Sequence, residues 1–330
     1  MNKSKIEWVD FEWNPVTGCK DVCAYCFGRL NAKNFSGEAD WNISKAKHYM
    51  DPDTGMTTDL LLLEEPLRTE AGTILTYPYG FAPTYTRSRL TTPERWKMTR
   101  NILVCAESEL FGDWIPTSVI REVMDACKKY PQHHYLFLTR HPERYLQLAQ
   151  AGILPDGDHF WYGVTVNKGA NKHISDLAQR GYHTYQVSEP LQGNAELAEG
   201  VEWLIIGPER GKRADKEQIE TSWVINLITQ AKIKEVPVFL SKGLPLPAYI
   251  EDKSMPEALT DIRPGKGHEK KLLARCISCG EESKKSQMIT LSVNHGRGSL
   301  NRTMGWWCEE CFEKFCTEHN MEIPDLRAQH

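Results

Sequence analysis

The chain has 330 residues and a formal net charge of −4 at neutral pH. Its length allows one large domain with an appendage, or two domains, and its 40% hydrophobic and 25% charged content is ordinary for folded globular proteins. The mild acidity argues against a surface devoted throughout to polyanions, although it leaves room for a local basic patch.

Short apolar runs alternate with amphipathic segments through the first three quarters of the chain. We expect strands at 102–106, 134–139, 161–166, 183–187, 203–207 and 236–240 and helices at 116–124, 142–149, 174–179 and 221–231. Further strands at 11–16 and 81–87 would bring the number of strands to eight. Nearly continuous apolar strands separated by helices are typical of a parallel sheet covered on both faces. The pattern therefore predicts an α/β fold with a full or partial parallel β/α barrel.

This barrel pattern occupies residues 1–245, and residues 33–78 interrupt it. They are polar and show little sustained periodicity, so we interpret them as an insertion, either a lid or a plain surface excursion. Residues 246–270 are rich in proline and glycine, which is typical of a linker. Residues 271–330 would then form a separate C-terminal module.

The apolar runs and the cysteines of the sequence bear on membrane association and on the redox compartment. The densest apolar run, residues 60–63, is far shorter than the ~20 residues that cross a bilayer. The N-terminus carries no apolar segment of the signal-peptide kind. The ten cysteines fall mostly into tight pairs and a triplet, which indicates metal binding in a reducing compartment. We expect a cytoplasmic protein with no membrane contact.

The triplet consists of Cys19, Cys23 and Cys26. Three thiolates this close together suit one inorganic cluster. A [4Fe–4S] cluster normally takes four cysteines, so three would leave one iron open to another ligand. Three unrelated thiols, or a disulfide with one spare cysteine, are the alternatives, and a reducing compartment disfavours the disulfide.

The C-x3-C-x2-C spacing, with Tyr25 before the last cysteine, resembles that of the radical S-adenosylmethionine (SAM) superfamily. The resemblance implies a [4Fe–4S] cluster on the three cysteines, with Tyr25 packed beside it and SAM bound at the open iron. It implies that the reduced cluster cleaves SAM and releases a 5′-deoxyadenosyl radical. It also implies an electron donor of the flavodoxin or ferredoxin type.

Polar side chains follow the expected strands at their carboxyl ends, where the catalytic groups of β/α barrels lie. The polar residues at these ends are Glu107, Ser108, Glu109, Thr139, Arg140, His141, Thr165, Asn167, Ser188, Glu189, Glu209, Arg210, Ser241 and Lys242. Those taken as candidates for binding SAM and a polar substrate are Glu107, Ser108, Thr139, Arg140, Thr165, Ser188, Glu189, Glu209 and Arg210. Some of them, such as Thr139 and Ser188, could instead cap helices. No residue is assigned a catalytic role.

Longer stretches resemble the phage and bacterial Gp37/Gp68 family, also described as DUF5131. They lie at 4–8, 13–19, 106–111, 138–144, 188–191 and 207–211. The resemblance spans about three quarters of the chain and implies a radical SAM barrel, without an established reaction. The chain departs from the family at Pro208, where a second glycine is expected, and proline removes one backbone donor from that loop.

The second cysteine cluster contains two C-x2-C pairs, which match the four ligands of a structural zinc site. The pairs are Cys276 with Cys279 and Cys308 with Cys311. A second iron–sulfur cluster is the main alternative, because four thiolates also suit it. Residues 312–318 have the pattern of a helix, on which Cys316 would be a spare ligand, as would His319 just beyond it, although a position on the helix surface is the simpler interpretation for both.

Basic and aromatic residues gather in this module: Lys270, Lys271, Arg275, Lys284, Lys285, Arg297, Arg302, Trp306 and Trp307. They would suit nucleic acid, although a solvated charged face is the common alternative.

The leading hypothesis is a radical SAM enzyme with a C-terminal zinc module, acting on an unknown substrate for which a nucleotide or nucleic acid is favoured. The alternative is a non-catalytic metal-binding protein with a degenerate barrel, which would bind nucleic acid or serve as a phage accessory protein. The oligomeric state stays open.

Overall fold

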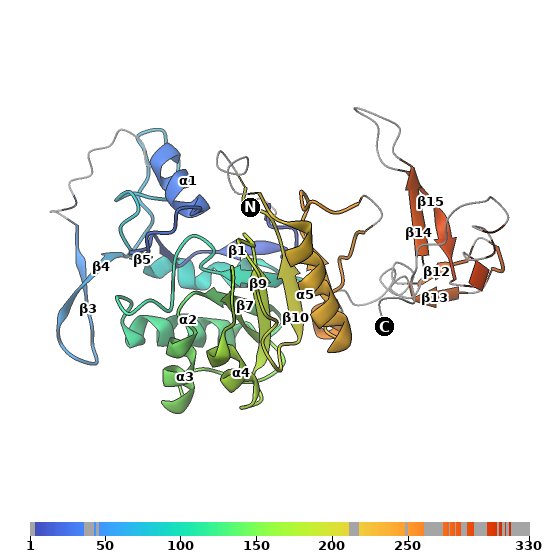
Figure 1. Cartoon of the computed structure of the whole chain (residues 1–330). Coiled ribbons are helices and arrows are strands. Elements are labelled where there is room, and N and C mark those ends of the chain that lie inside the picture. Colours follow the sequence, from blue (N-terminus) through green and yellow to red (C-terminus); the bar gives the residue numbers. More distant parts are fainter. Residues whose placement is uncertain are drawn as a thin grey trace.

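The computed structural model describes residues 4–35, 43, 46–210, 218–247 and 250–260 (Figure 1). Of the C-terminal module it describes residues 273–276, 278–280, 282–284, 289–293, 302–308, 310, 311, 314 and 317. Within these ranges, no helix is long and apolar enough to cross a membrane.

Seven strands form the central sheet, and every neighbouring pair in it runs parallel. In sheet order they are β1 (Phe11–Trp13), β6 (Asn101–Val104), β7 (His134–Thr139), β8 (Phe160–Thr165), β9 (His183–Ser188), β10 (Trp203–Ile206) and β11 (Val238–Leu240). The sheet runs from β1 to β11 without closing on itself. The predicted parallel β/α architecture is confirmed in its partial form, an open half-barrel.

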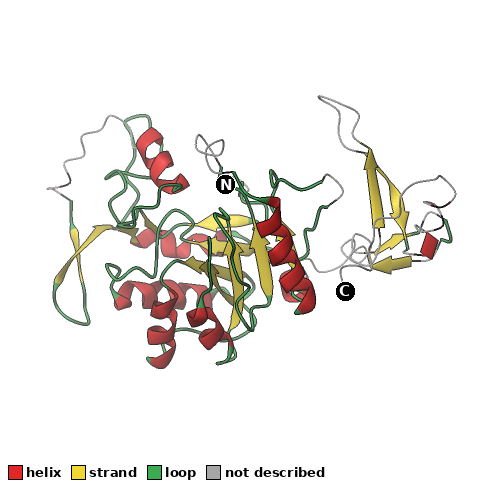
Figure 2. Cartoon of the chain, in the orientation of Figure 1, coloured by secondary structure: helices red, strands yellow, loops and turns green. Residues whose placement is uncertain are grey.

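Helices follow the strands as expected and cover the outer face of the sheet (Figure 2). They are α2 (Thr117–Lys129), α3 (Pro142–Gln150), α4 (Lys172–Ala178) and α5 (Thr221–Ile233). In α2, Val119, Ile120 and Val123 recur at helical spacing and are fully buried. Lysines occupy its last turn, where cations favour the negative end of the helix dipole.

Apolar side chains cover both faces of the sheet, as a buried parallel sheet requires. On one face the side chains of alternate strand positions pack under the helices. On the other face, Trp161, Tyr185 and Trp203 line the inside of the half-barrel. Trp8, which precedes β1, meets Trp203 edge to face, with ring centroids 6.0 Å apart.

The segment after β11 completes this inner packing. Residues 250–260, assigned to a linker by their composition, lie against the sheet and end in the short helix α6 (Glu257–Thr260). Leu259 is fully buried there, and its carbonyl oxygen accepts from Asn101 Nδ2 at 2.9 Å. The indole nitrogen of Trp203 donates to the carbonyl of Ser254 at 3.0 Å. This part of the segment therefore belongs to the barrel core.

A second, four-stranded sheet has the order β2 (Val16–Thr17), β5 (Thr84–Thr86), β4 (Thr57–Leu63) and β3 (His48–Met50). The expected barrel strand at 81–87 is thus wrong in its location, because β5 pairs with β2 and β4. The expected strand at 11–16 is divided into β1 and β2 at Pro15, which has no N–H to continue the ladder. Part of the expected insertion, β3 and β4, therefore belongs to a sheet. The 3₁₀ helix η2 (Arg87–Arg95) leads back to the barrel.

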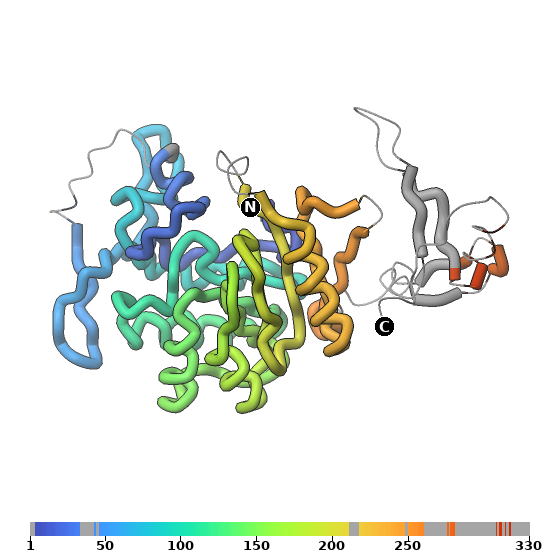
Figure 3. Tube along the Cα trace, in the orientation of Figure 1, coloured from blue at the N-terminus to red at the C-terminus, as the bar shows by residue number. Residues whose placement is uncertain are grey.

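This second sheet is fixed to α2 through one partly buried and one buried polar contact. Tyr85 donates to Glu122 at 2.6 Å, and Ser118 donates to Asp51 at 2.7 Å. Figure 3 shows these N-terminal elements, in blue, on one side of the half-barrel and the segment after β11, in orange, on the other.

The C-terminal module contains two antiparallel hairpins. One pairs β12 (Leu273–Arg275) with β13 (Glu282–Lys284), and the other pairs β14 (Ile289–Val293) with β15 (Arg302–Trp307). Five residues of the basic and aromatic group therefore lie on these strands: Arg275, Lys284, Arg302, Trp306 and Trp307. Outside the described residues lie Cys316, His319, Lys270, Lys271, Lys285 and Arg297, as well as most of the expected helix at 312–318.

His134, at the start of β7, makes the stability of the barrel depend on pH. Burial, with smaller contributions from the charges of His159 and His133, lowers the pKa of His134 to about 4. In the unfolded chain a histidine titrates near pH ~6.5, so the unfolded state binds more protons between these two values. We expect the His134 contribution to be complete above pH ~6.5 and to fall by about 2 kcal/mol between pH 7 and pH 5.

Thermal or urea unfolding at both pH values measures this loss. His134→Gln should show a smaller loss than the wild-type protein, whereas His48→Gln, a change at an exposed histidine on β3, should not. Equal losses in His134→Gln and the wild-type protein would contradict the prediction.

Candidate functional site

The three-cysteine loop is attached at the carboxyl ends of the parallel strands. It leaves β2 through Gly18, whose φ of +79° favours glycine. A Cβ at this position would lie 2.4 Å from the carbonyl oxygen of Ala82. Gly18 N donates to the carbonyl of Glu107 just after β6 at 3.1 Å, and Cys19 N donates to that of Phe81 at 3.1 Å. Glycine is therefore required where the loop crosses the end of β6.

Backbone N–H groups face two of the three sulfur atoms, although burial raises the pKa of both Cys19 and Cys23. Asp21 N donates to Cys19 Sγ at 3.2 Å, and Arg29 N donates to Cys26 Sγ at 3.3 Å. Burial raises the pKa of Cys19 to about 12, and the negative charge of Asp21 contributes to the rise. A metal would have to displace this proton, because the thiolate is the ligand form. Two sulfurs already accept backbone N–H groups, so the donor set fits an iron–sulfur cluster.

Tyr25, inside the loop, reaches the ends of two barrel strands. Its hydroxyl donates to Asn167 Oδ1 at 2.8 Å, just beyond β8. Arg140, just beyond β7, donates to the Tyr25 hydroxyl and also to Asn167 Oδ1, the latter at 3.1 Å. The guanidinium of Arg140 lies 5.5 Å from the centre of the Tyr25 ring. Two strand ends thereby hold the loop above the edge of the sheet.

A second contact joins the loop to β7 through an ionisable pair. His141 Nε2 lies 3.0 Å from Asp21 Oδ2. Burial acts to lower the pKa of His141, but the hydrogen bond to Asp21 and the negative charge of Glu109 raise it above its usual value. Ligand atoms of Asp21, Glu109 and His141 all lie within 4.8 Å of one another.

Glu109 is the buried member of the group formed by Asp21, Glu109 and His141. Its buried carboxylate accepts from Thr139 Oγ1 at 2.6 Å and from Arg140 N at 3.0 Å. Burial raises the pKa of Glu109 above its usual value, although these hydrogen bonds oppose the rise. Glu109 thus fixes the turn after β7 that carries Arg140 and His141.

The far end of the sheet edge carries a separate network of charges. Glu189, after β9, accepts from Arg210 Nε at 3.1 Å and from Ser241 Oγ at 3.1 Å. Arg210 also donates to Glu7 at 3.2 Å. Burial raises the pKa of Glu189, and the charge of Arg210 opposes the rise. A Cβ on Gly207 would lie 2.4 Å from Cδ of Glu189, so this carboxylate needs a glycine beside it.

The predicted strand-end residues thus fall into two groups. Glu107, Ser108, Thr139 and Arg140 lie around the cysteine loop, whereas Ser188, Glu189, Glu209 and Arg210 lie at the ends of β9 and β10. Thr139 and Ser188 are buried, and Ser188 Oγ accepts from Gln186 at 3.3 Å. Thr165 ends β8, but it is Asn167 that meets Tyr25.

Asp21 is the residue of the loop contacts that the sequence did not single out, although it lies inside the cysteine triplet. Glu109, His141 and Asn167 were among the polar residues expected at the strand ends, but they were not taken as candidate contacts of SAM or substrate. Their hydrogen bonds with Thr139, Asp21 and Tyr25 place them at the loop.

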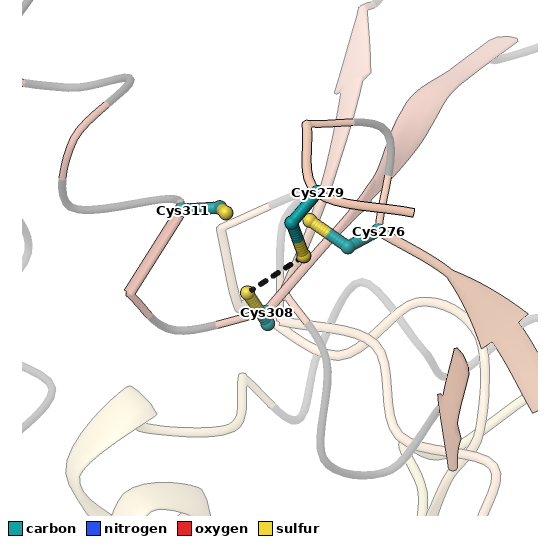
Figure 4. A group of neighbouring side chains, drawn as sticks. All are labelled: Cys276, Cys279, Cys308 and Cys311. Carbon is teal, nitrogen blue, oxygen red and sulfur yellow. Dashed lines mark hydrogen bonds between the residues drawn. The ribbon is translucent and has the colours of Figure 1, made fainter. Parts of the chain in front are cut away.

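The four C-terminal cysteines converge on one point (Figure 4). The sulfur atoms of Cys276, Cys279, Cys308 and Cys311 all lie within 4.8 Å of one another, and those of Cys279 and Cys308 are 3.9 Å apart. A tetrahedral ion with metal–sulfur bonds of about 2.3 Å holds its sulfurs about 3.8 Å apart. The group therefore has the dimensions of a site for a single tetrahedral metal ion.

The turn at the first C-x2-C pair supports this geometry. Gly280 has a φ of +75°, and its N–H closes the turn onto the carbonyl of Cys276 at 2.9 Å. Burial acts to raise the pKa of Cys276, but backbone N–H groups of Cys279, Cys308 and Ser278 bring it to about 6. These N–H groups therefore favour the thiolate form of Cys276, whereas the hydrogen bond with Cys308 and burial raise the pKa of Cys311 to about 12.

Comparison with known proteins gives one family and one group of solved structures. The family described as "Protein of unknown function (DUF5131)" matches residues 3–249. Spore photoproduct lyase complexed with dinucleoside spore photoproduct is similar at a TM-score of 0.37 and 9% identity, covering 97% of this chain and 74% of that one. A tyrosine-to-phenylalanine mutant of the lyase gives 0.35 and 10%, with the same coverage. A double mutant with bound AdoMet and dinucleoside spore photoproduct gives 0.30 and 9%, covering 83% and 75%. No curated protein matches the chain.

Proposed function

The chain belongs to the DUF5131 family, and we propose that it is a radical SAM enzyme. The observation that carries the proposal is the position of the three-cysteine loop. Cys19, Cys23 and Cys26 lie above the carboxyl edge of an open parallel half-barrel, where β/α proteins bind ligands. Tyr25 joins the loop to the ends of β7 and β8 through Arg140 and Asn167.

The three cysteines would hold a [4Fe–4S] cluster, which with SAM supplies a 5′-deoxyadenosyl radical. The chain itself would position and shield that chemistry. Thr139 and Glu109 hold the turn after β7, so that Arg140 stays above the edge of the sheet.

The residues proposed to contact SAM and substrate differ in how exposed their side chains are. Arg140 is exposed and has no carboxylate partner among the contacts described above, so its guanidinium is the better placed to meet an anionic group. Arg210 is exposed as well, but it is paired with Glu189 and Glu7 and would have to exchange these partners for a ligand. The remaining proposed contacts are Glu107, Ser108, Thr165, Ser188, Glu189 and Glu209. The buried Thr139 and Ser188 would act by holding neighbouring groups in place.

We further propose that the C-terminal cysteines bind zinc. A single ion accounts for four sulfurs that lie within 4.8 Å of one another. In a [4Fe–4S] cluster each thiolate binds a different iron, so the sulfurs would lie farther apart. The basic and aromatic composition of this module supports a nucleotide or nucleic acid as the substrate class.

A SAM cleavage assay tests the proposed function. After anaerobic reconstitution with iron and sulfide, the wild-type protein with dithionite and SAM should produce 5′-deoxyadenosine and methionine, even without substrate. Cys26→Ala should reduce both products at least tenfold, because one cluster ligand is lost. A fully loaded and reduced wild-type protein that forms neither product would instead favour the non-catalytic alternative with a degenerate barrel.

A further inference from the structure

Asn167 lies two residues beyond β8, is half-buried, and contacts three separate segments of the chain. Its side-chain oxygen accepts from the Tyr25 hydroxyl at 2.8 Å and from Arg140 Nη1 at 3.1 Å. Its side-chain nitrogen donates to the carbonyl of Pro190 at 2.5 Å. Its backbone carbonyl accepts from Gln192 N at 2.8 Å. Asn167 thereby joins the three-cysteine loop, the end of β7 and the turn after β9.

The partners of Asn167 fix the orientation of its amide group. An arginine guanidinium only donates hydrogen bonds, and a backbone carbonyl only accepts them. The amide oxygen therefore faces Arg140, and the amide nitrogen faces Pro190. The Tyr25 hydroxyl accepts from Arg140, so its single proton is left for Asn167. Asparagine satisfies all of these partners, whereas aspartate would lose the donor and leucine would lose both the donor and the acceptor.

The turn after β9 extends these contacts to the other half of the sheet edge. Glu189 directly precedes Pro190, and its carboxylate is paired with Arg210 at 3.1 Å. Leu191 N donates to the carbonyl of Gly207, just after β10, at 3.0 Å. The turn is therefore fixed to the end of β10. Through this turn, Asn167 links the two groups of strand-end residues, one around the three-cysteine loop and the other at the ends of β9 and β10.

We infer that Asn167 is a positioning residue, which holds the three-cysteine loop at a fixed distance from the turn after β9. The inference rests on the proposed function, because the loop is the segment that would bind the cluster. A ligand that meets both the loop and the strand ends binds more tightly when the loop is already ordered, since binding then need not supply the ordering free energy. Asn167 acts through Tyr25 and Arg140 and is assigned no contact with the ligand.

Asn171 offers a matched control, because it is an equally half-buried asparagine only four residues away. Its side chain accepts from the N–H groups of His173 and Ile174 and so caps α4. Asn171→Leu should lower the unfolding temperature through the loss of this cap, without changing the loop. A role of Asn167 in stability alone would make Asn167→Leu and Asn171→Leu behave alike.

Hydrogen exchange of residues 19–27 measures the order of the loop in the full-length chain before any iron is added. In Asn167→Leu and in Tyr25→Phe these amides should exchange about tenfold faster than in the wild-type protein, because the hydrogen bond between the two side chains is lost. The double variant should exchange about as fast as Asn167→Leu, since both substitutions remove the same contact. Asn171→Leu should exchange at the wild-type rate in this segment.

EPR of the reconstituted and reduced protein, titrated with SAM, measures the effect on binding. Asn167→Leu should keep the iron content of the wild-type protein, because the three cysteines are intact. Half of the SAM-dependent change in its spectrum should require about tenfold more SAM, whereas Asn171→Leu should match the wild-type protein.

Unchanged loop exchange in Asn167→Leu, or an equal acceleration in Asn171→Leu, would overturn this inference alone. A SAM half-saturation that stayed at the wild-type value despite faster loop exchange would overturn it as well. A wild-type protein whose reduced cluster gave no spectral change with SAM would instead overturn the proposed function, while the exchange measurements still decided whether Asn167 orders the loop.

Discussion

Replacing Cys19, Cys23 and Cys26 together by Ala should remove all iron from the barrel. Anaerobically reconstituted wild-type protein should show the broad brown absorption of a [4Fe–4S] cluster, and the triple variant should be colourless with iron reduced at least tenfold. The reason is that the other described thiols are otherwise placed: Cys105 and Cys127 are buried, and the four C-terminal cysteines converge on one another. Iron and sulfide analysis, with EPR of the reduced protein, provides the measurement.

Cys127→Ala is the control for this experiment. Cys127 is a fully buried thiol in α2, so its loss should cost about 1 kcal/mol of stability through a small cavity and leave the iron content unchanged. A triple variant that kept a full complement of iron in the barrel would rule out the assignment of the cluster to the loop.

Loss of the zinc proposed for the C-terminal cysteines should have a large but local effect. Because such sites rarely preform without their ion, Cys276→Ser or Cys308→Ser should release about one zinc and unfold the region between the two pairs. The described site is closed by four sulfurs, so no open position for catalysis is expected. Limited proteolysis should separate the module from a barrel that stays folded and keeps its iron chromophore.

Metal analysis of the same variants decides between zinc and iron. If either substitution removed iron and left zinc unchanged, the second site would be an auxiliary iron–sulfur cluster and the zinc proposal would fail. Serine is suitable for the test, because it keeps the size of the side chain while replacing the sulfur ligand.

The barrel was predictable because its strands are short, continuous apolar runs. The run at 203–206 is buried along its whole length, as both faces of a parallel sheet require. A run of this kind does not indicate the sheet to which it belongs. The segment at 84–86 was therefore assigned to the barrel, although its partners are β2 and β4.

The parts of the site that could be predicted are those whose residues lie close together in the sequence. The spacing of three cysteines within eight residues is visible without a fold, and so are the two C-x2-C pairs. The contact of Asp21 with His141 joins residues 120 positions apart. Such a pair depends on how the loop lies across the strand ends, and neither residue type is distinctive by itself.

The inner packing of the half-barrel has a consequence for how the protein folds during synthesis. Trp8, near the start of the chain, and Leu259, about 250 positions later, belong to the same buried cluster. Bringing together such distant segments closes a very long loop, which is slow and is completed late. In a ribosome-bound chain that ends before Leu259, aromatic rings such as Trp161 and Trp203 would be incompletely covered. Such a chain would be prone to aggregation until the segment that contains α6 has left the ribosome.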